Sequence, residues 1–136
     1  FMHTNQSGIT RGYYGMEDVY ACNRRMLEMF NLPDDFFDAV CIAPEDRFVV
    51  DGLRKPSPKF ELEMISRYEL PPDQCWMVGD KWLDAETGLN AGMKAALVQT
   101  GKPMDDALCE QAKSNAVPIF PSLAECVDHM LDLIDE

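Results

Sequence analysis

The sequence lacks long apolar runs and has few basic residues. None of its apolar stretches approaches the ~18 consecutive residues that a membrane-spanning helix needs. Its 12 lysines and arginines are outnumbered by 24 acidic side chains, so the formal net charge is −12. Binding to nucleic acid or to anionic lipid depends on basic residues. We therefore predict neither a nucleic-acid partner nor a membrane partner.

Closely spaced cysteines are missing as well. No Cys-x-x-Cys pair occurs, and an odd number of cysteines is scattered along the chain: Cys22, Cys41, Cys75, Cys109 and Cys126. Disulfide frameworks and zinc clusters usually bring cysteines closer together in the sequence. We therefore expect reduced, mostly buried thiols in a cytoplasmic protein.

The chain does have enough apolar residues for a core. Hydrophobic residues make up 46% of the 136, and we find no internal repeat, low-complexity tract or interdomain linker. This length and composition are typical of one globular domain. We therefore predict that residues 1–136 form a single domain. We also expect a monomer or weak dimer.

Short apolar runs alternate with amphipathic stretches along the whole chain. Strands are predicted at 1–4, 37–43, 75–79, 95–98 and 117–120. Helices are predicted at 17–31, from 57, at 82–91, at 105–114 and from 122. Such alternation predicts an α/β fold, a doubly wound parallel sheet with helices on both faces.

Polar residues follow the first predicted strand, in the segment 4–8. In an open parallel sheet, ligands bind at the carboxyl ends of the strands. The hydroxyl of Thr4, the amide of Asn5 and the backbone N–H groups of the loop could donate hydrogen bonds to an oxyanion. The alternative is an ordinary polar turn that ends in glycine. We expect His3 to be a strand residue near this point.

A basic pair, Arg54 and Lys55, precedes the helix predicted to begin at Ser57-Pro58. A helix N-terminus favours anions, and a lysine placed there could neutralise a phosphoryl group. The alternative is that both cations are simply solvated.

Two acids follow the strand predicted at 75–79. Asp80 lies at its end, and Asp84 comes four residues later on the following helix. Carboxylates suit a hard cation such as Mg²⁺, and Gly79 would let the backbone come close to a ligand. The alternative is that these acids only cap and charge the first helical turn.

These groups together outline a site for phosphoryl transfer, which needs mainly positioning and charge neutralisation. Five of the 12 basic residues lie in or beside the three motifs, which would give an acidic chain a local basic focus for an anionic substrate. They are Arg11, Arg54, Lys55, Lys59 and Lys81.

The segments 4–12, 54–56 and 78–84 resemble motifs II, III and IV of the haloacid dehalogenase (HAD) phosphatase superfamily. The resemblance covers residues 1 to about 101. The Thr-Asn-Gln-Ser-Gly-Ile string is similar to the branch that holds heptose bisphosphate and histidinol phosphate phosphatases. This resemblance implies a Mg²⁺-dependent phosphatase that works through an aspartyl-phosphate intermediate.

The resemblance also implies roles for single residues. Thr4 would hold a phosphoryl oxygen, and Lys55 would stabilise the phosphoaspartate and the transition-state charge. Asp80 would bind Mg²⁺, with Asp84 supporting the outer shell of the metal. The expected contacts to phosphate, substrate or the catalytic carboxylate are Asn5, Ser7, Arg11, Arg54 and Lys81.

The chain departs from the family pattern in two places. No Asp-x-Asp follows a strand ahead of Thr4, so the resemblance implies that the first, central strand of the sheet is absent from this chain. We predict an N-terminal extension of roughly 30 to 50 residues, the size of a strand, loop and helix. Without it, the chain would be inactive. At the two arms of the zinc loop found in related phosphatases, this chain has Cys41-Ile42-Ala43 and Asp51-Gly52-Leu53, so we expect no structural zinc.

Several substrates stay open at this point. A small phosphorylated metabolite of the sugar phosphate or heptose bisphosphate type is the first expectation. Histidinol phosphate and a nucleic-acid 3′-phosphate are alternatives, and so is a phosphate-binding module without turnover. The stretch between Thr4 and Lys55 is too short for a large cap domain.

Overall fold

A computed structural model describes residues 1–135 of the chain. The chain divides into two compact units, Phe1–Phe60 and the residues from Glu61 onward, each with its own parallel sheet. The prediction of a single domain stays a prediction. No helix among residues 1–135 is long and apolar enough to cross a membrane.

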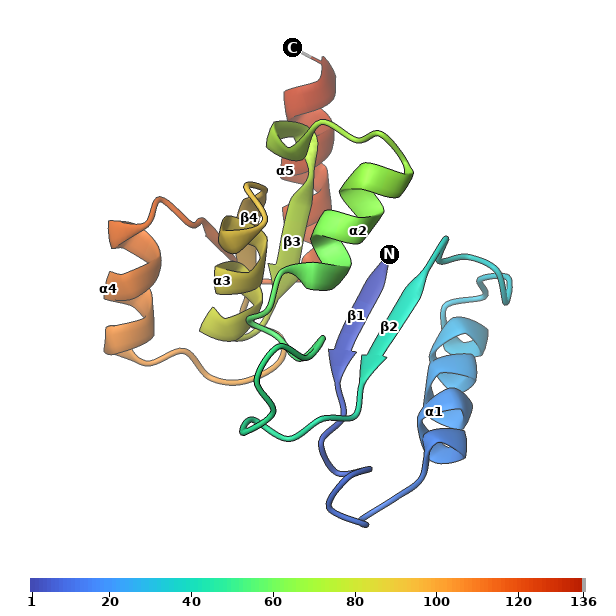
Figure 1. Ribbon diagram of the computed structural model, residues 1–136. Coiled ribbons are helices and arrows are strands. Elements are labelled where there is room, and N and C mark those ends of the chain that lie inside the picture. Colours follow the sequence, from blue (N-terminus) through green and yellow to red (C-terminus); the bar gives the residue numbers. More distant parts are fainter. Residues whose placement is uncertain (136) are drawn as a thin grey trace. The chain divides into compact units, whose positions relative to one another are not determined.

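The first unit is built on two parallel strands joined by a helix, as Figure 1 shows. Its elements are β1 (Met2–Asn5), α1 (Met16–Met29) and β2 (Val40–Ala43). The register runs from Met2 opposite Val40 to Asn5 opposite Ala43. The N–H of Gln6 continues the ladder by donating to the carbonyl of Ala43 at 2.7 Å. This ladder aligns the carboxyl ends of β1 and β2.

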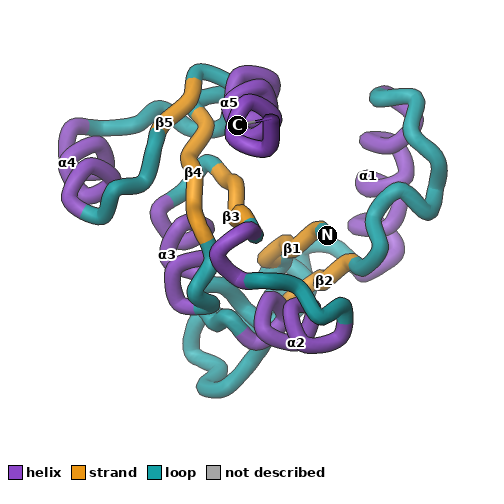
Figure 2. Tube along the Cα trace, turned by 90° about the horizontal axis from the view of Figure 1, so that it is seen from above, coloured by secondary structure: helices purple, strands orange, loops and turns teal. Residues whose placement is uncertain are grey.

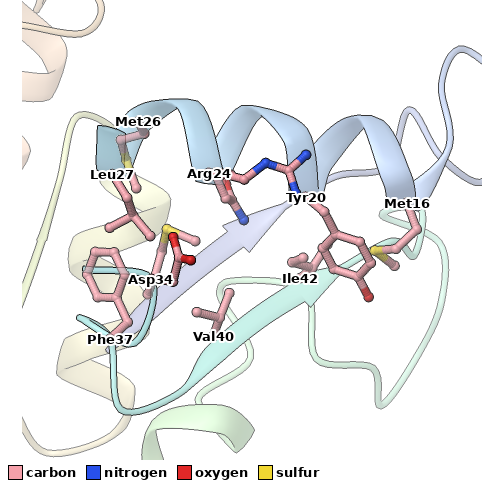
Figure 3. Close-up of a pocket in the computed structure, with 11 residues that line it drawn as sticks. Met16, Tyr20, Arg24, Met26, Leu27, Asp34, Phe37, Val40 and Ile42 are labelled. Carbon is pink, nitrogen blue, oxygen red and sulfur yellow. The ribbon is translucent and has the colours of Figure 1, made fainter. Parts of the chain in front are cut away.

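A cavity of about 530 Å³ lies between α1 and these strands (Figure 3). Its walls are mainly apolar, and they include Tyr20 and Leu27 from α1 and Val40 and Ile42 from β2. None of the residues predicted to contact phosphate lines it. The cavity therefore contains none of the side chains predicted to contact phosphate.

The second unit contains three parallel strands in the order β3-β4-β5. Helix α2 (Lys59–Arg67) begins at the end of the first unit and continues into the second. The remaining elements are the short 3₁₀ helix η1 (Pro72–Gln74), β3 (Trp76–Gly79), α3 (Trp82–Asn90), β4 (Lys94–Val98), α4 (Asp106–Ser114), β5 (Ile119–Phe120) and α5 (Leu123–Asp135).

Strand β4 has helices against both of its faces (Figure 2). Successive side chains of a strand point to opposite faces. Ala95 and Leu97 pack in one cluster with residues of α3 and α4. Ala96 and Val98 pack in another cluster with Cys126 of α5. The predicted arrangement of helices on both faces of a parallel sheet is confirmed.

The order of the elements is also confirmed, but several boundaries differ. Helix α1 ends at Met29 because Asn31 adopts a left-handed conformation, with φ of 53°, and the N–H of Leu32 turns back to the carbonyl of Leu27. Strand β5 begins at Ile119 because Pro118 has no N–H, although its carbonyl still accepts from Leu97. Strand β5 lies at an edge of the three-stranded sheet.

Replacing Leu97 by alanine is expected to destabilise the protein by about 2–5 kcal/mol, since the side chain is fully buried between β4 and its helices. Urea unfolding followed by circular dichroism measures the change. The matched control is Leu131→Ala, at a leucine that is 53% exposed. It should cost less than about 1 kcal/mol. Equal losses for the two variants would contradict the packing described here.

Candidate functional site

The hydroxyl of Thr4, near the end of β1, is held in a chain of polar contacts. Thr4 Oγ1 accepts a hydrogen bond from Gln6 Nε2 at 2.9 Å. Gln6 Oε1 in turn accepts from the hydroxyl of Tyr14 at 2.6 Å. Because Thr4 is the acceptor in its contact with Gln6, its own O–H can donate to a further group. This geometry suits contact with an oxygen of a phosphoryl group.

Lys55 is fixed against β1 through both its backbone and its side chain. Its N–H donates to Asn5 Oδ1 at 2.9 Å, and its carbonyl accepts from Asn5 Nδ2 at 3.2 Å. The ammonium of Lys55 donates to the backbone carbonyl of His3 at 3.0 Å. The structure thus brings Asn5 and Lys55 together across 50 residues of sequence, beside Thr4.

The position of the basic pair differs from the sequence-based interpretation. Helix α2 begins at Lys59, four residues after Lys55, so the ammonium is placed by β1 and not by a helix N-terminus. The carbonyl of Arg54 accepts from the N–H of Ser57 at 3.0 Å, which closes a turn ahead of the helix. Arg54 itself is partly buried.

Arg11 lies in the turn after β1, where it forms an ion pair. Its Nε donates to Asp46 Oδ2 at 2.9 Å, and its backbone N–H donates to the carbonyl of Ser7 at 3.1 Å. The hydrogen bond from Arg11 lowers the pKa of Asp46, and Asp46 raises the pKa of Arg11. Both groups are therefore charged at neutral pH. Asp46 takes only one of the five guanidinium N–H donors.

The two acids of the third motif lie in the second unit and have different surroundings. Asp80 is the first residue after β3 and is partly buried. Asp84 is 5% exposed, and its Oδ2 accepts from the backbone N–H of Lys81 at 3.1 Å. Asp84 therefore caps α3, as the alternative interpretation predicted. The side chain of Lys81 is exposed.

Two glycines make room for these carboxylates. A Cβ added at Gly101, after β4, would lie 2.1 Å from Asp80 Oδ2. A Cβ added at Gly79 would lie 2.2 Å from Asp84 Oδ2. The space beside Gly79, which the sequence suggested for a ligand, is taken by the Asp84 carboxylate. Gly101 was not identified from the sequence as a residue of the site. Its position in the loop after a predicted strand was a signal that could have indicated it.

The donor atoms of the third motif fit a magnesium ion. No group of three or more His, Cys, Asp or Glu side chains that could hold a metal occurs in residues 1–135. Mg²⁺ commonly takes only one or two protein carboxylates and fills its other positions with water and phosphate oxygens. Asp80 therefore suits direct coordination. Asp84, whose Oδ2 is committed to the cap, suits a supporting contact.

Comparison with known proteins places the chain in a family. The model of the HAD-hydrolase-like family matches residues 52–126, which is more than half of the chain. The chain belongs to the HAD-hydrolase-like family. The superfamily predicted from the three motifs is thereby confirmed. Two of the HAD motifs, at 54–56 and 78–84, lie inside the matched residues.

Two curated relatives show how much of a HAD protein the chain spans. It is 33% identical over 143 residues to the D-glycero-D-manno-heptose-1,7-bisphosphate 7-phosphatase of Chlorobaculum tepidum, covering 95% of this chain and 65% of the relative. It is 35% identical over 107 residues to the D-glycero-beta-D-manno-heptose-1,7-bisphosphate 7-phosphatase of Helicobacter pylori strain J99, covering 74% and 59%. The chain thus spans about three fifths to two thirds of their length.

A solved structure has the same fold. It is the crystal structure of D,D-heptose 1.7-bisphosphate phosphatase from B. bronchiseptica complexed with magnesium and phosphate. The TM-score is 0.78 at 24% sequence identity, and the match covers 96% of this chain and 72% of that one. This likeness establishes that the chain shares the α/β fold of that structure.

Asn5→Asp tests the contact that holds Lys55. The substitution replaces the Nδ2 donor by a carboxylate oxygen facing the carbonyl of Lys55. Two acceptors then oppose each other, and we expect a loss of about 1–3 kcal/mol in the free energy of unfolding, measured in urea. Gln111→Glu makes the same atom and charge change at an exposed position of α4 and should have almost no effect. An unaltered stability of Asn5→Asp would contradict the contact.

Proposed function

We propose that this protein is a Mg²⁺-dependent phosphatase that hydrolyses a small phosphorylated sugar, of the sugar phosphate or heptose bisphosphate type. The observation that carries the proposal is that the ammonium of Lys55 is fixed to β1, the same strand that carries the oriented hydroxyl of Thr4. Membership of the HAD family and the names of the curated relatives support the reaction and the substrate class.

Thr4 and Lys55 have complementary tasks in this proposal. The O–H of Thr4 donates to a non-bridging oxygen of the phosphoryl group, and the Lys55 ammonium neutralises charge on that group in the transition state. Neither residue needs to move far, because Gln6 orients the hydroxyl and Asn5 holds the backbone of Lys55. Preorganised charge of this kind lowers the barrier without reorganisation during the reaction.

The other residues predicted to contact phosphate or substrate either lie close to Thr4 or Lys55 in the sequence or carry a positive charge. Asn5 acts by positioning Lys55, while Ser7, Arg11 and Arg54 are proposed to contact the substrate or its phosphate. Arg11 keeps guanidinium donors beyond the Nε that pairs with Asp46. Lys81 is proposed to add positive charge near Asp80. The acidic net charge of −12 disfavours a nucleic-acid 3′-phosphate as the substrate.

Asp80 is proposed to coordinate Mg²⁺, with Asp84 supporting it. Bound Mg²⁺ would neutralise phosphate charge and polarise the phosphoryl group. Asp84 contributes by fixing the turn between β3 and α3 through its contact with the N–H of Lys81. The loop at Gly101 limits the positions open to the Asp80 carboxylate. A cation ligand held in this way loses little freedom on binding.

The proposed reaction transfers the phosphoryl group to an aspartate carboxylate and then to water. In the first step the ester P–O bond breaks, a P–O bond to the carboxylate forms, and the leaving oxygen takes a proton. In the second step water displaces the carboxylate and releases inorganic phosphate. We assign neither the nucleophile nor the proton donor to residues 1–136. Thr4 and Lys55 act on the same phosphoryl oxygens in both steps.

We further propose a cytoplasmic protein that is a monomer or weak dimer. All five cysteines are free thiols, as a reducing compartment would keep them. Burial raises the pKa of the Cys75 and Cys126 thiols, so both are protonated and poorly reactive at neutral pH.

The proposal is tested with the protein expressed from its complete reading frame. Phosphate release is measured over a panel of sugar phosphates, heptose bisphosphate and histidinol phosphate, with Mg²⁺ and with EDTA. We expect release that needs Mg²⁺, and a loss of kcat of about 100-fold or more in Asp80→Asn. Asp128→Asn, at an exposed position of α5, is the matched control. Absence of release from every compound, or full activity of Asp80→Asn, would reject the proposal.

Gly101→Ala probes the Asp80 carboxylate without changing it. The added methyl group would overlap Asp80 Oδ2, so the carboxylate must turn away. We expect the Mg²⁺ concentration that gives half-maximal activity to rise about 10-fold. Gly15→Ala is the control, because its added Cβ would meet nothing closer than 3.8 Å. An unchanged Mg²⁺ dependence of Gly101→Ala would contradict the assigned position of Asp80.

A further inference from the structure

The loop between β2 and Lys55 contains a carboxylate that contacts the Lys55 segment directly. Glu45 is the second residue after β2, and its Oε1 accepts a hydrogen bond from the backbone N–H of Leu53 at 2.6 Å. Leu53 precedes Lys55 by two residues. Glu45 therefore ties the segment 52–55 to the carboxyl end of β2.

Leu53 also contacts β1, through its carbonyl. The carbonyl of Leu53 lies 2.9 Å from His3 Nε2. A carbonyl can only accept, so Nε2 of His3 carries the hydrogen in this contact. Leu53 is thus held through its N–H by Glu45 and through its carbonyl by His3. Asn5 holds the backbone of Lys55. Together these contacts restrict the conformation of the backbone on both sides of Arg54.

The glycine beside Leu53 allows the carboxylate to reach its N–H. A Cβ added at Gly52 would lie 2.7 Å from Glu45 Oε1 and 3.3 Å from its Cδ. Any other residue at position 52 would push the carboxylate away from the backbone. The contact between Glu45 and the N–H of Leu53 therefore requires glycine at position 52.

The two oxygens of Glu45 have different surroundings. Oε1 makes the contact with Leu53, whereas Oε2 is buried and has no hydrogen-bond partner among residues 1–135. The stabilising contribution to the segment therefore comes from the acceptor Oε1. A neutral side chain of the same shape would keep that acceptor, and it would remove a buried charge that is only partly compensated.

We propose that Glu45 is a positioning residue for Lys55. Its carboxylate fixes residues 52–55 so that the ammonium of Lys55 stays beside the end of β1. This inference rests on the proposed function, in which Lys55 stabilises the transition state. Glu45 touches neither substrate nor metal in this role and acts only through the backbone of Leu53.

The test compares Glu45→Ala with Glu45→Gln in the protein expressed from its complete reading frame. We expect Glu45→Ala to lower kcat about 10-fold with a small change in KM, because a misplaced Lys55 weakens the transition state more than the ground state. Glu45→Gln keeps the acceptor and should retain kcat within about 2-fold. Glu17→Ala, at an exposed glutamate of α1, is the control.

Amide hydrogen exchange gives a readout that does not need activity. The N–H of Leu53 should exchange faster in Glu45→Ala and at the wild-type rate in Glu45→Gln.

Two kinetic results would overturn the inference. One is a kcat of Glu45→Ala within 2-fold of wild type. The other is an equal loss of kcat in Glu45→Ala and Glu45→Gln, because it would show that the charge of Glu45 matters and not its acceptor. A wild-type protein that releases no phosphate rejects the proposed function instead. Exchange at Leu53 then still decides whether Glu45 holds the segment.

Discussion

The two hydrogen bonds between the side-chain amide of Asn5 and the backbone of Lys55 are the contact on which the first unit of this protein depends. One amide group satisfies both the N–H and the carbonyl of a residue 50 positions away. A carboxylate would offer no donor and a lysine no acceptor, so the geometry requires an amide. Because β1 is itself fixed by its ladder to β2, the segment around Lys55 is held against a rigid element.

The second unit depends instead on close packing against β4. Ala95 and Ala96 point to opposite faces of this strand and are almost completely buried, which lets helices approach the sheet from both sides. The short strand β3 enters the same sheet and ends directly before Asp80. Asp84 then closes the turn into α3 by accepting a hydrogen bond from the backbone N–H of Lys81, the residue that precedes the helix. The acidic motif thus serves the fold as well as its proposed chemistry.

Most of the fold could be predicted from the sequence because its signals are local. Apolar runs alternate with amphipathic stretches at helical and strand periods, and each run became the expected element. The errors fall at boundaries, where one residue decides the outcome. Asn31 ended α1 early through its left-handed conformation, and Ser57-Pro58 did not start α2, which begins at Lys59. Backbone conformation at single positions depends on contacts that hydrophobic periodicity does not encode.

The sequence by itself determined the kind of fold, the family and the residue types of the candidate site. The reason is that the succession of strands and helices, the spacing of the motifs and the positions of charged residues are properties of the sequence. Only the tertiary structure decided how those residues are held. It placed the ammonium of Lys55 by β1 and not by a helix, and it filled the space beside Gly79 with Asp84. It also brought Glu45 to the N–H of Leu53. Some of these contacts join residues that are far apart in the sequence, and others depend on the direction in which a side chain points. The distances between such groups are set only when the backbone has folded.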